Sequence, residues 1–136
     1  KQYSDCEVKV EYKARSGHGG FYCRTGRVKH AISVAGFQAE IDASGKSAGG
    51  LYETMGRKWA AKPSAKLKAF KPGAWNTMTV RAVGRNVVVH LNGIKTAELK
   101  NDPGRLKGHF GLQLHGGLEM DVSFRNIQIK ELKESK

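Results

Sequence analysis

Residues 6–13, CEVKVEYK, alternate strictly between a residue with an apolar or aromatic side chain and a charged residue. Successive side chains of a strand point to opposite faces, so this period of two predicts a strand with one face in a core and the other in solvent. The alternation recurs in Phe37–Ile41 and in Trp75–Val83, where Met78 and Val80 are expected to face inward. No stretch has the period of a long amphipathic helix. The sequence therefore predicts an all-β fold, an antiparallel β-sandwich.

Turn signals divide the chain into some eight or nine short strands. Asn92-Gly93 is the strongest of them, because both residues tolerate the positive φ that a two-residue hairpin turn needs. Residues 55–72 show neither helical nor strand periodicity and contain Pro63 and Pro72, so a long loop is predicted there. A chain of 136 residues can bury one core, and we expect a single domain over residues 1–136.

The predicted last strand changes phase within its length. It contains two apolar pairs of opposite parity, Val122 with Phe124 and Ile127 with Ile129. A β-bulge near Arg125-Asn126 adds one residue and would return both pairs to the core. A bulge can also aim a side chain toward a site, but an Arg at this place is as often one partner of a structural ion pair.

Charge is the strongest compositional signal, because 24 Lys and Arg residues against 12 Asp and Glu give a formal net charge of +12. Such a balance attracts polyanions such as nucleic acid. The basic residues are spread over strands and turns, however, and only residues 57–71 concentrate them. A solubilising basic surface is therefore favoured over a nucleic-acid site. No apolar run approaches the roughly 20 residues of a membrane helix, so no membrane partner is expected.

Several polar residues take strand positions next to glycine. The segment Phe110–Gly117, FGLQLHGG, puts Gln113 and His115 on the face opposite its large apolar residues, and Gln38 and Glu40 share a face of another strand. A sheet face of small and polar residues forms a shallow groove. Sugars suit such grooves, because their hydroxyl groups need paired hydrogen-bond donors and acceptors.

Eight short motifs occur in order along the chain: Tyr3–Lys13, Gly20–Arg24, Gly36–Ile41, Gly50–Glu53, Trp75–Met78, Leu91–Gly93, Gly111–Gly116 and Phe124–Ile127. Together they resemble the 3-keto-disaccharide hydrolase domain family, which has a concanavalin A-like β-sandwich of the jelly-roll type. The resemblance runs over nearly the whole chain and implies a secreted or periplasmic protein, with the leader absent from this sequence. The family usually has further strands before Tyr3, which this chain is expected to lack.

The resemblance implies cleavage of a glycoside whose sugar carries a ketone at C3. The ketone acidifies the C2 hydrogen, so that a base can remove it, the aglycone leaves from C1, and water then adds. His115 or Glu40 would be the general base. Arg24 would stabilise the enolate oxygen, and Glu53 would protonate the leaving oxygen. No cofactor is required, although Glu40, Glu53 and His115 could instead ligate a divalent cation.

Contacts to the substrate are expected from five further side chains, Gln38, Tyr52, Trp59, Gln113 and Arg125. The rings of Tyr52 and Trp59 would cover the apolar face of a sugar ring, whereas Trp75 is expected to pack in the core. Two other classes of function stay open. One is a non-catalytic carbohydrate-binding module on the same sandwich, and the other is a basic domain that binds nucleic acid or another polyanion.

Overall fold

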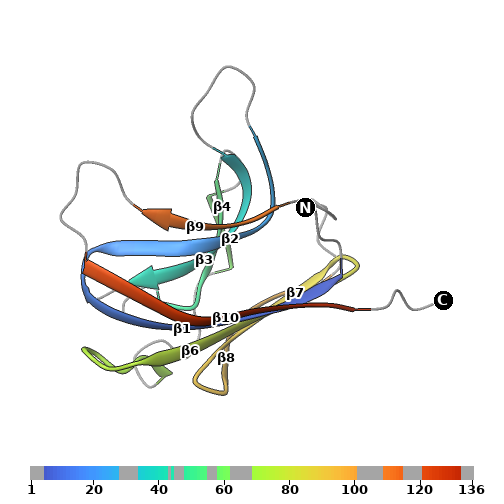
Figure 1. Ribbon diagram of the computed structural model, residues 1–136. Coiled ribbons are helices and arrows are strands. Elements are labelled where there is room, and N and C mark those ends of the chain that lie inside the picture. The colour runs from blue at the N-terminus through green and yellow to red at the C-terminus, as the bar shows by residue number, and fades with distance from the viewer. Residues whose placement is uncertain are drawn as a thin grey trace.

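Two five-stranded antiparallel sheets pack face to face in the computed structural model, which describes residues 5–27, 34–42, 44, 48–54, 58–61, 69–100, 109–114 and 121–132 (Figure 1). The predicted antiparallel β-sandwich is thus confirmed. Ten strands lie within the described residues, which is more than the eight or nine expected. No helix in this part of the chain is long and apolar enough to cross a membrane.

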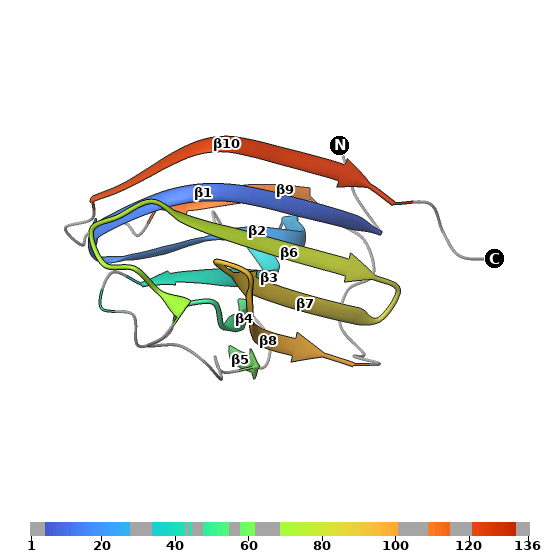
Figure 2. The ribbon, with the colours of Figure 1, turned by 90° about the horizontal axis from the view of Figure 1, so that it is seen from below.

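The first sheet has the strand order β10-β1-β6-β7-β8. Its strands are β10 (Asp121–Glu131), β1 (Cys6–Ser16), β6 (Asn76–Val83), β7 (Asn86–Leu91) and β8 (Ile94–Leu99). The second sheet has the order β5-β4-β3-β2-β9. Its strands are β5 (Lys58–Ala61), β4 (Leu51–Thr54), β3 (Val34–Asp42), β2 (His18–Arg27) and β9 (His109–Leu114). Figure 2 looks onto the first sheet, with β2, β3 and β9 behind it.

The core lies between the two sheets and is formed mainly by the inward positions of the alternating strands, with Ala48, Ala69 and Phe70 from outside the strands. In β1, Val8, Val10 and Tyr12 are at most 1% exposed, as the alternation predicts. Ile41 and Leu51 of the second sheet are fully buried in the same core. Fully burying one such aliphatic side chain stabilises the fold by about 1.5–3 kcal/mol, so these positions fix which face of each strand turns inward.

The predicted bulge is present in β10. Between the pairs Lys9–Gln128 and Glu11–Arg125, two residues of β10 stand against one residue of β1. Asn126 takes a left-handed φ of 53° there. The bulge returns Ile129 to the core side but leaves Ile127 41% exposed, so the expectation that both isoleucines are buried was half wrong. Ile127 lies at the bulge itself, where the regular alternation of faces is interrupted.

One part of the predicted loop at residues 55–72 is a strand. β5 pairs with β4 through Leu51–Ala61, Tyr52–Trp59 and Glu53–Lys58. Four residues at the edge of a sheet are too few to show an alternating pattern, which explains why the sequence alone did not reveal β5.

Two asparagine side chains fasten the start of β6. Asn76 is fully buried, and its Oδ1 accepts from the backbone N–H of Lys71 and from Nδ2 of Asn92, both at 2.8 Å. Its Nδ2 donates to the carbonyl groups of Lys71 and Ala74, both at 2.9 Å. Asn92 and Gly93 have φ values of 52° and 83°, which confirms the predicted hairpin turn. The sequence indicated the turn but not the hydrogen bond from the Asn92 side chain to Asn76.

A hydrogen bond from β8 fixes the turn that precedes β4. Thr96 is fully buried, and its hydroxyl donates to the carbonyl oxygen of Gly49 at 2.7 Å. The N–H of Gly49 donates to the carbonyl of Glu40, and the N–H of Glu40 donates to the carbonyl of Gly50, at 3.0 and 2.9 Å. The first sheet therefore holds the backbone beside Glu40 in place.

Candidate functional site

Polar and aromatic positions form a row across the second sheet. Gln38 of β3 pairs with Tyr22 of β2 on one side and with Tyr52 of β4 on the other, and Tyr52 pairs with Trp59 of β5. Direct partners in an antiparallel sheet lie on the same face. Three residues predicted to contact a sugar, Gln38, Tyr52 and Trp59, are therefore at register positions of one face, opposite to that of Ile41 and Leu51 in the core.

Glu40 belongs to the next row of that face and has glycine on both sides. It pairs with Gly20 of β2, which pairs with Gln113 of β9. On the side of β4, its backbone bonds go to Gly49 and Gly50. Glu40 is only 8% exposed although it points away from the core positions of its strand, so this carboxylate lies in a shielded place on the outer face.

The other predicted catalytic residues are not all at this row. Glu53 pairs with Phe37, on the parity of Leu51, so its register position is on the core side of β4. Arg24 lies where β2 shifts register, between Cys23 and Gly26 in its pairing with β3 and between Tyr22 and Thr25 in its pairing with β9. His115 lies outside the described residues. The catalytic roles of these residues and of Glu40 stay predictions.

Arg125 lies on the other sheet. Its Nε donates to Oε2 of Glu11 at 3.2 Å, and its guanidinium carbon is 3.8 Å from the ring centre of Trp75. Trp75 is half-buried rather than part of the core, which corrects the expectation for that residue. Trp75 precedes β6, and the cationic groups of Lys13 and Arg125 lie over its ring at the outer face of the first sheet. Arg125 therefore does not share a sheet with Gln38 and Glu40, and it has the structural ion pair that the sequence left open.

Glu11 is the acidic member of this second group. Hydrogen bonds from Nδ2 of Asn126 to both carboxylate oxygens, at 2.8 and 3.3 Å, lower the pKa of Glu11, and the bond and charge of Arg125 lower the pKa further. Asn126 reaches Glu11 because the bulge gives it a left-handed backbone. A carboxylate with these partners is ionised at neutral pH and holds the Arg125 guanidinium in one orientation.

Asp42, at the end of β3, is a buried acid that sequence reasoning missed. It is 2% exposed, and its Oδ1 accepts from the N–H and the hydroxyl of Ser44 at 2.9 and 2.8 Å. Its charge acts on the buried Tyr12, whose pKa is raised first by burial and then by Asp42. The sequence Asp42-Ala-Ser44 is typical of an Asx-turn. This pattern predicts a turn but does not indicate that the carboxylate is buried.

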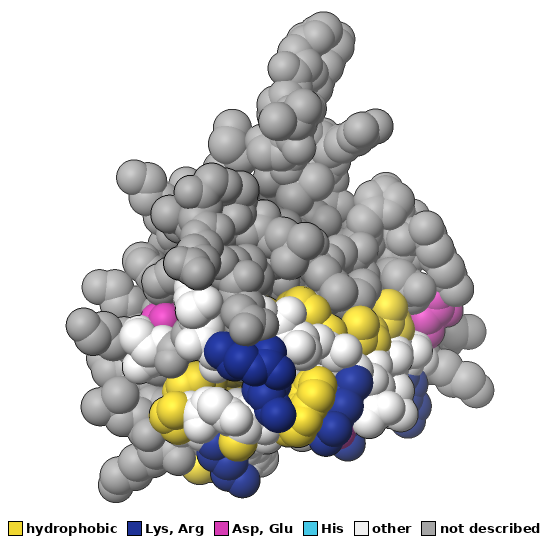
Figure 3. Space-filling view, turned by 60° about the vertical axis from the view of Figure 1, so that its left-hand side comes forward, with side chains coloured by type: hydrophobic (Ala, Val, Ile, Leu, Met, Phe, Trp, Pro, Cys, Tyr) yellow, Lys and Arg dark blue, Asp and Glu magenta, His cyan; other side chains and the backbone are white. Residues whose placement is uncertain are grey.

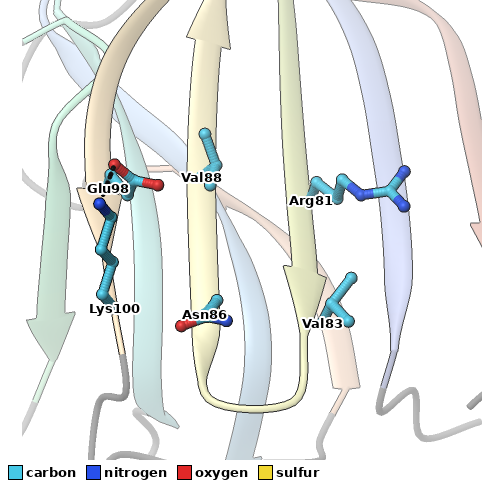
Figure 4. A pocket seen from close by; sticks show the side chains of 6 residues that line it. All are labelled: Arg81, Val83, Asn86, Val88, Glu98 and Lys100. Carbon is cyan, nitrogen blue, oxygen red and sulfur yellow. Dashed lines mark ion pairs between the residues drawn. The ribbon is translucent and has the colours of Figure 1, made fainter. Parts of the chain in front are cut away.

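A shallow cavity of about 380 Å³ lies on the first sheet (Figure 4). Six residues line it: Arg81, Val83, Asn86, Val88, Glu98 and Lys100. Its charged members form ion pairs at the surface, Arg81 with Glu7 at 3.0 Å and Lys100 with the half-buried Glu98 at 3.9 Å. None of the residues predicted to act in a site lines this cavity. Within the described ranges, no group of three or more His, Cys, Asp and Glu residues could hold a metal ion.

The family model for 3-keto-alpha-glucoside-1,2-lyase-like domains matches residues 1–130. The chain belongs to this family. The resemblance seen in the ordered motifs is confirmed, and with it a carbohydrate-related function. A comparison with curated proteins found no match.

Solved structures share this fold. A proposed glycosyl hydrolase from Parabacteroides distasonis ATCC 8503 is 26% identical with a TM-score of 0.72, over 97% of this chain and 80% of that chain. The carbohydrate-binding module CBM66 from Bacillus subtilis is 15% identical with a TM-score of 0.73, over 96% and 78%. A Bacillus subtilis protein with a galectin-like fold is 12% identical with a TM-score of 0.75, over 99% and 76%. The last two likenesses support the fold alone.

Proposed function

We propose that this domain cleaves 3-keto-glycosides on the outer face of the second sheet. The observation that carries the proposal is the row Gln113–Gly20–Glu40, in a member of the 3-keto-alpha-glucoside-1,2-lyase-like family. It places a shielded carboxylate between positions that lack side chains. Glycine lets a ligand approach the backbone closely, which supports this row as the place where a sugar ring meets Glu40.

The reaction begins at the C2–H bond, which the C3 ketone acidifies. A general base takes the proton, the electron pair of the C–H bond moves into the enolate, and the aglycone then leaves from C1 with its bonding pair. Water adds to the resulting C1=C2 bond to complete the hydrolysis. We assign the base to Glu40 or His115, because carboxylates and imidazoles transfer protons near neutral pH when their surroundings adjust the pKa.

The remaining roles follow from this assignment. Arg24 would donate to the enolate oxygen, and the residue of the pair Glu40 and His115 that is not the base would protonate the leaving oxygen. Glu53 is the weaker candidate for that acid, because its register position is on the core side of β4. Gln38, Tyr52 and Trp59 would position the sugar across the row.

Aglycone release from a 3-keto-glucoside, with and without EDTA, tests the proposal. Glu40→Gln keeps the shape of the side chain but cannot accept a proton, and should lower turnover by about 10²–10⁴-fold. His115→Ala should also lower turnover. Glu7→Gln, the same chemical change on an exposed residue of the first sheet, should leave it unchanged. A loss only with EDTA would assign the polarising role to a divalent cation.

No release by the intact protein under either condition would reject the enzyme. Binding of the 3-keto-glucoside or of the corresponding glucoside without release would then assign the domain to the non-catalytic carbohydrate-binding modules. The family resemblance also leads us to propose a secreted or periplasmic location, which fractionation of cells that produce the full-length protein would test.

A further inference from the structure

An aromatic ring carries two cations at one end of the outer face of the first sheet. The ammonium nitrogen of Lys13 is 5.3 Å from the ring centre of Trp75, and the guanidinium carbon of Arg125 is 3.8 Å from it. Cations within about 6 Å of an indole ring are attracted by its negative face. Trp75 therefore holds two positive groups from β1 and β10 close together on a half-exposed surface.

The orientation of Arg125 is fixed on one edge. Its Nε donates to Glu11, and Asn126 holds both oxygens of that carboxylate. Among the described residues, the two Nη groups of Arg125 have no hydrogen-bond partner. A guanidinium that keeps both Nη groups available, with its plane held by an aromatic ring, matches a carboxylate ligand through two parallel hydrogen bonds.

The surroundings of this guanidinium are positive. Lys13 forms no ion pair with any described residue, and Arg15 follows on the same face of β1, where its Nη1 donates to the hydroxyl of Ser123 at 3.2 Å. Glu11, already bonded to Arg125, is the acid in this group. On the face drawn in Figure 3, Lys and Arg side chains lie among hydrophobic ones, with Asp and Glu toward the sides.

We propose that Trp75, Lys13, Arg15 and Arg125 form a second binding surface, which takes the carboxylate groups of a uronate-containing polysaccharide. A polysaccharide is favoured over nucleic acid for two reasons. The chain belongs to a carbohydrate-related family. In addition, Arg125 lies in contact with the ring of Trp75, so this face of the ring is not available to stack a nucleobase, as single-stranded nucleic-acid sites require.

The position of this surface separates it from the proposed catalytic row. Lys13 and Arg125 are on β1 and β10 of the first sheet, whereas Glu40 is on β3 of the second. Binding of an acidic polysaccharide would therefore hold the domain on a polymer while the other sheet stays open to a small 3-keto-glycoside.

Isothermal titration calorimetry with polygalacturonate at about 0.15 M salt tests the surface, because exposed charges beyond about 8 Å are largely screened there. The double variant Lys13→Gln/Arg125→Gln should weaken binding about tenfold or more, the effect of losing one charge-assisted hydrogen-bonded pair. The control Lys95→Gln/Lys100→Gln removes the same charge from the β8 side of the same sheet and should weaken binding no more than about threefold. Fully methyl-esterified polygalacturonate should not bind measurably.

Further variants keep the test specific. Arg125→Lys retains the charge but removes the two-pronged guanidinium, so its affinity should fall between those of the wild type and the double variant. Unfolding curves must show that each variant is folded, and release of aglycone from a small 3-keto-glucoside should be the same in both double variants. Failure of the proposed catalytic function would leave the polygalacturonate result unaffected.

Three outcomes would overturn the proposal. One is absence of binding to polygalacturonate by the wild-type protein. Another is an equal loss of affinity in the two double variants, which would show a general attraction of charge without a site at Trp75. The third is tighter binding of single-stranded DNA than of polygalacturonate at equal charge and salt concentration, which would assign the surface to nucleic acid.

Discussion

Gly49→Ala tests whether the contact with β8 fixes the turn beside Glu40. Gly49 has a φ of 80°, in the left-handed region that side chains with a Cβ adopt only at a cost. A Cβ on this residue would overlap the hydroxyl of Thr96 and lie 2.8 Å from its Cβ. Thr96 is fully buried and donates its hydroxyl to the carbonyl of Gly49, so it cannot move aside without losing that bond.

The cost of Gly49→Ala has two parts. The left-handed backbone costs about 1–2 kcal/mol for a residue with a Cβ. Overlap with a packed side chain adds about 1–3 kcal/mol, while the lower flexibility of Ala in the unfolded chain returns about 0.4–1 kcal/mol. We expect the free energy of unfolding to fall by about 2–4 kcal/mol.

Gly73→Ala is the matched control. Gly73 also has a left-handed φ, of 65°, but a Cβ there would meet nothing within 4 Å. Only the backbone cost remains, about 1 kcal/mol after the gain in the unfolded chain. The double variant Gly49→Ala/Thr96→Ala separates the overlap from the strain. Its loss in free energy of unfolding should be about 1–2 kcal/mol smaller than the sum of the two single losses, because part of the overlap is removed.

Urea unfolding followed by circular dichroism gives the free energy from the midpoint and the slope. If Gly49→Ala costs no more than Gly73→Ala, or if the losses of Gly49→Ala and Thr96→Ala are additive, then Thr96 does not hold the turn in place. Because the turn bonds to the backbone of Glu40, Gly49→Ala should also slow aglycone release more than Gly73→Ala does, at temperatures where both are folded.

Two more predictions concern buried polar groups. Asn76→Ala should lower the free energy of unfolding by about 2–4 kcal/mol, since four hydrogen bonds of a buried amide are lost at about 1 kcal/mol each. Gln128→Ala, at an exposed amide, should change it by less than about 0.5 kcal/mol in the same urea experiment, and equal losses would contradict the role of Asn76. Tyr12→Phe should keep the stability or raise it by about 1 kcal/mol, because the buried hydroxyl has no hydrogen-bond partner in the described structure. Burial raises the pKa of Tyr12, so the unfolded chain loses this proton first and stability should fall as the pH rises above about 10. Unfolding at about pH 8 and about pH 11 should show a smaller fall for Tyr12→Phe than for the wild type, and an equal fall would contradict the raised pKa.

The sequence predicted those parts of the fold in which burial sets the order of residues. β1 and β6 alternate because one face of each packs in the core, and a shift of one residue would expose that whole face. The phase change in β10 indicated its bulge for the same reason. β5 and the exposure of Ile127 were not predictable, because a four-residue edge strand and a bulged residue show no alternation.

The candidate site was predicted only in part, because a pattern within one strand does not give the register between strands. Gln38 and Glu40 were expected to share a face, but the pairings to Tyr52 and Gly20 depend on which residues of β2, β3 and β4 meet. The same register puts Glu53 on the face of β4 that carries the buried Leu51. Arg125 could not be assigned to the first sheet until its pairing with Glu11 was seen.

The two outer faces differ in what their residues do for stability. The outward positions of β1 carry Glu7, Lys9, Glu11 and Lys13, long side chains that cover strand backbone and keep a surface soluble. The corresponding row of the second sheet carries Gly20 beside Glu40. Glycine in a strand interior costs about 0.5–1 kcal/mol relative to Ala. Gly20 is buried and Glu40 is only 8% exposed, so this row is not an ordinary solvent-facing surface. Glycine inside a strand is typical of a point where a ligand or another backbone approaches closely, and this favours the second sheet over the first for the proposed sugar.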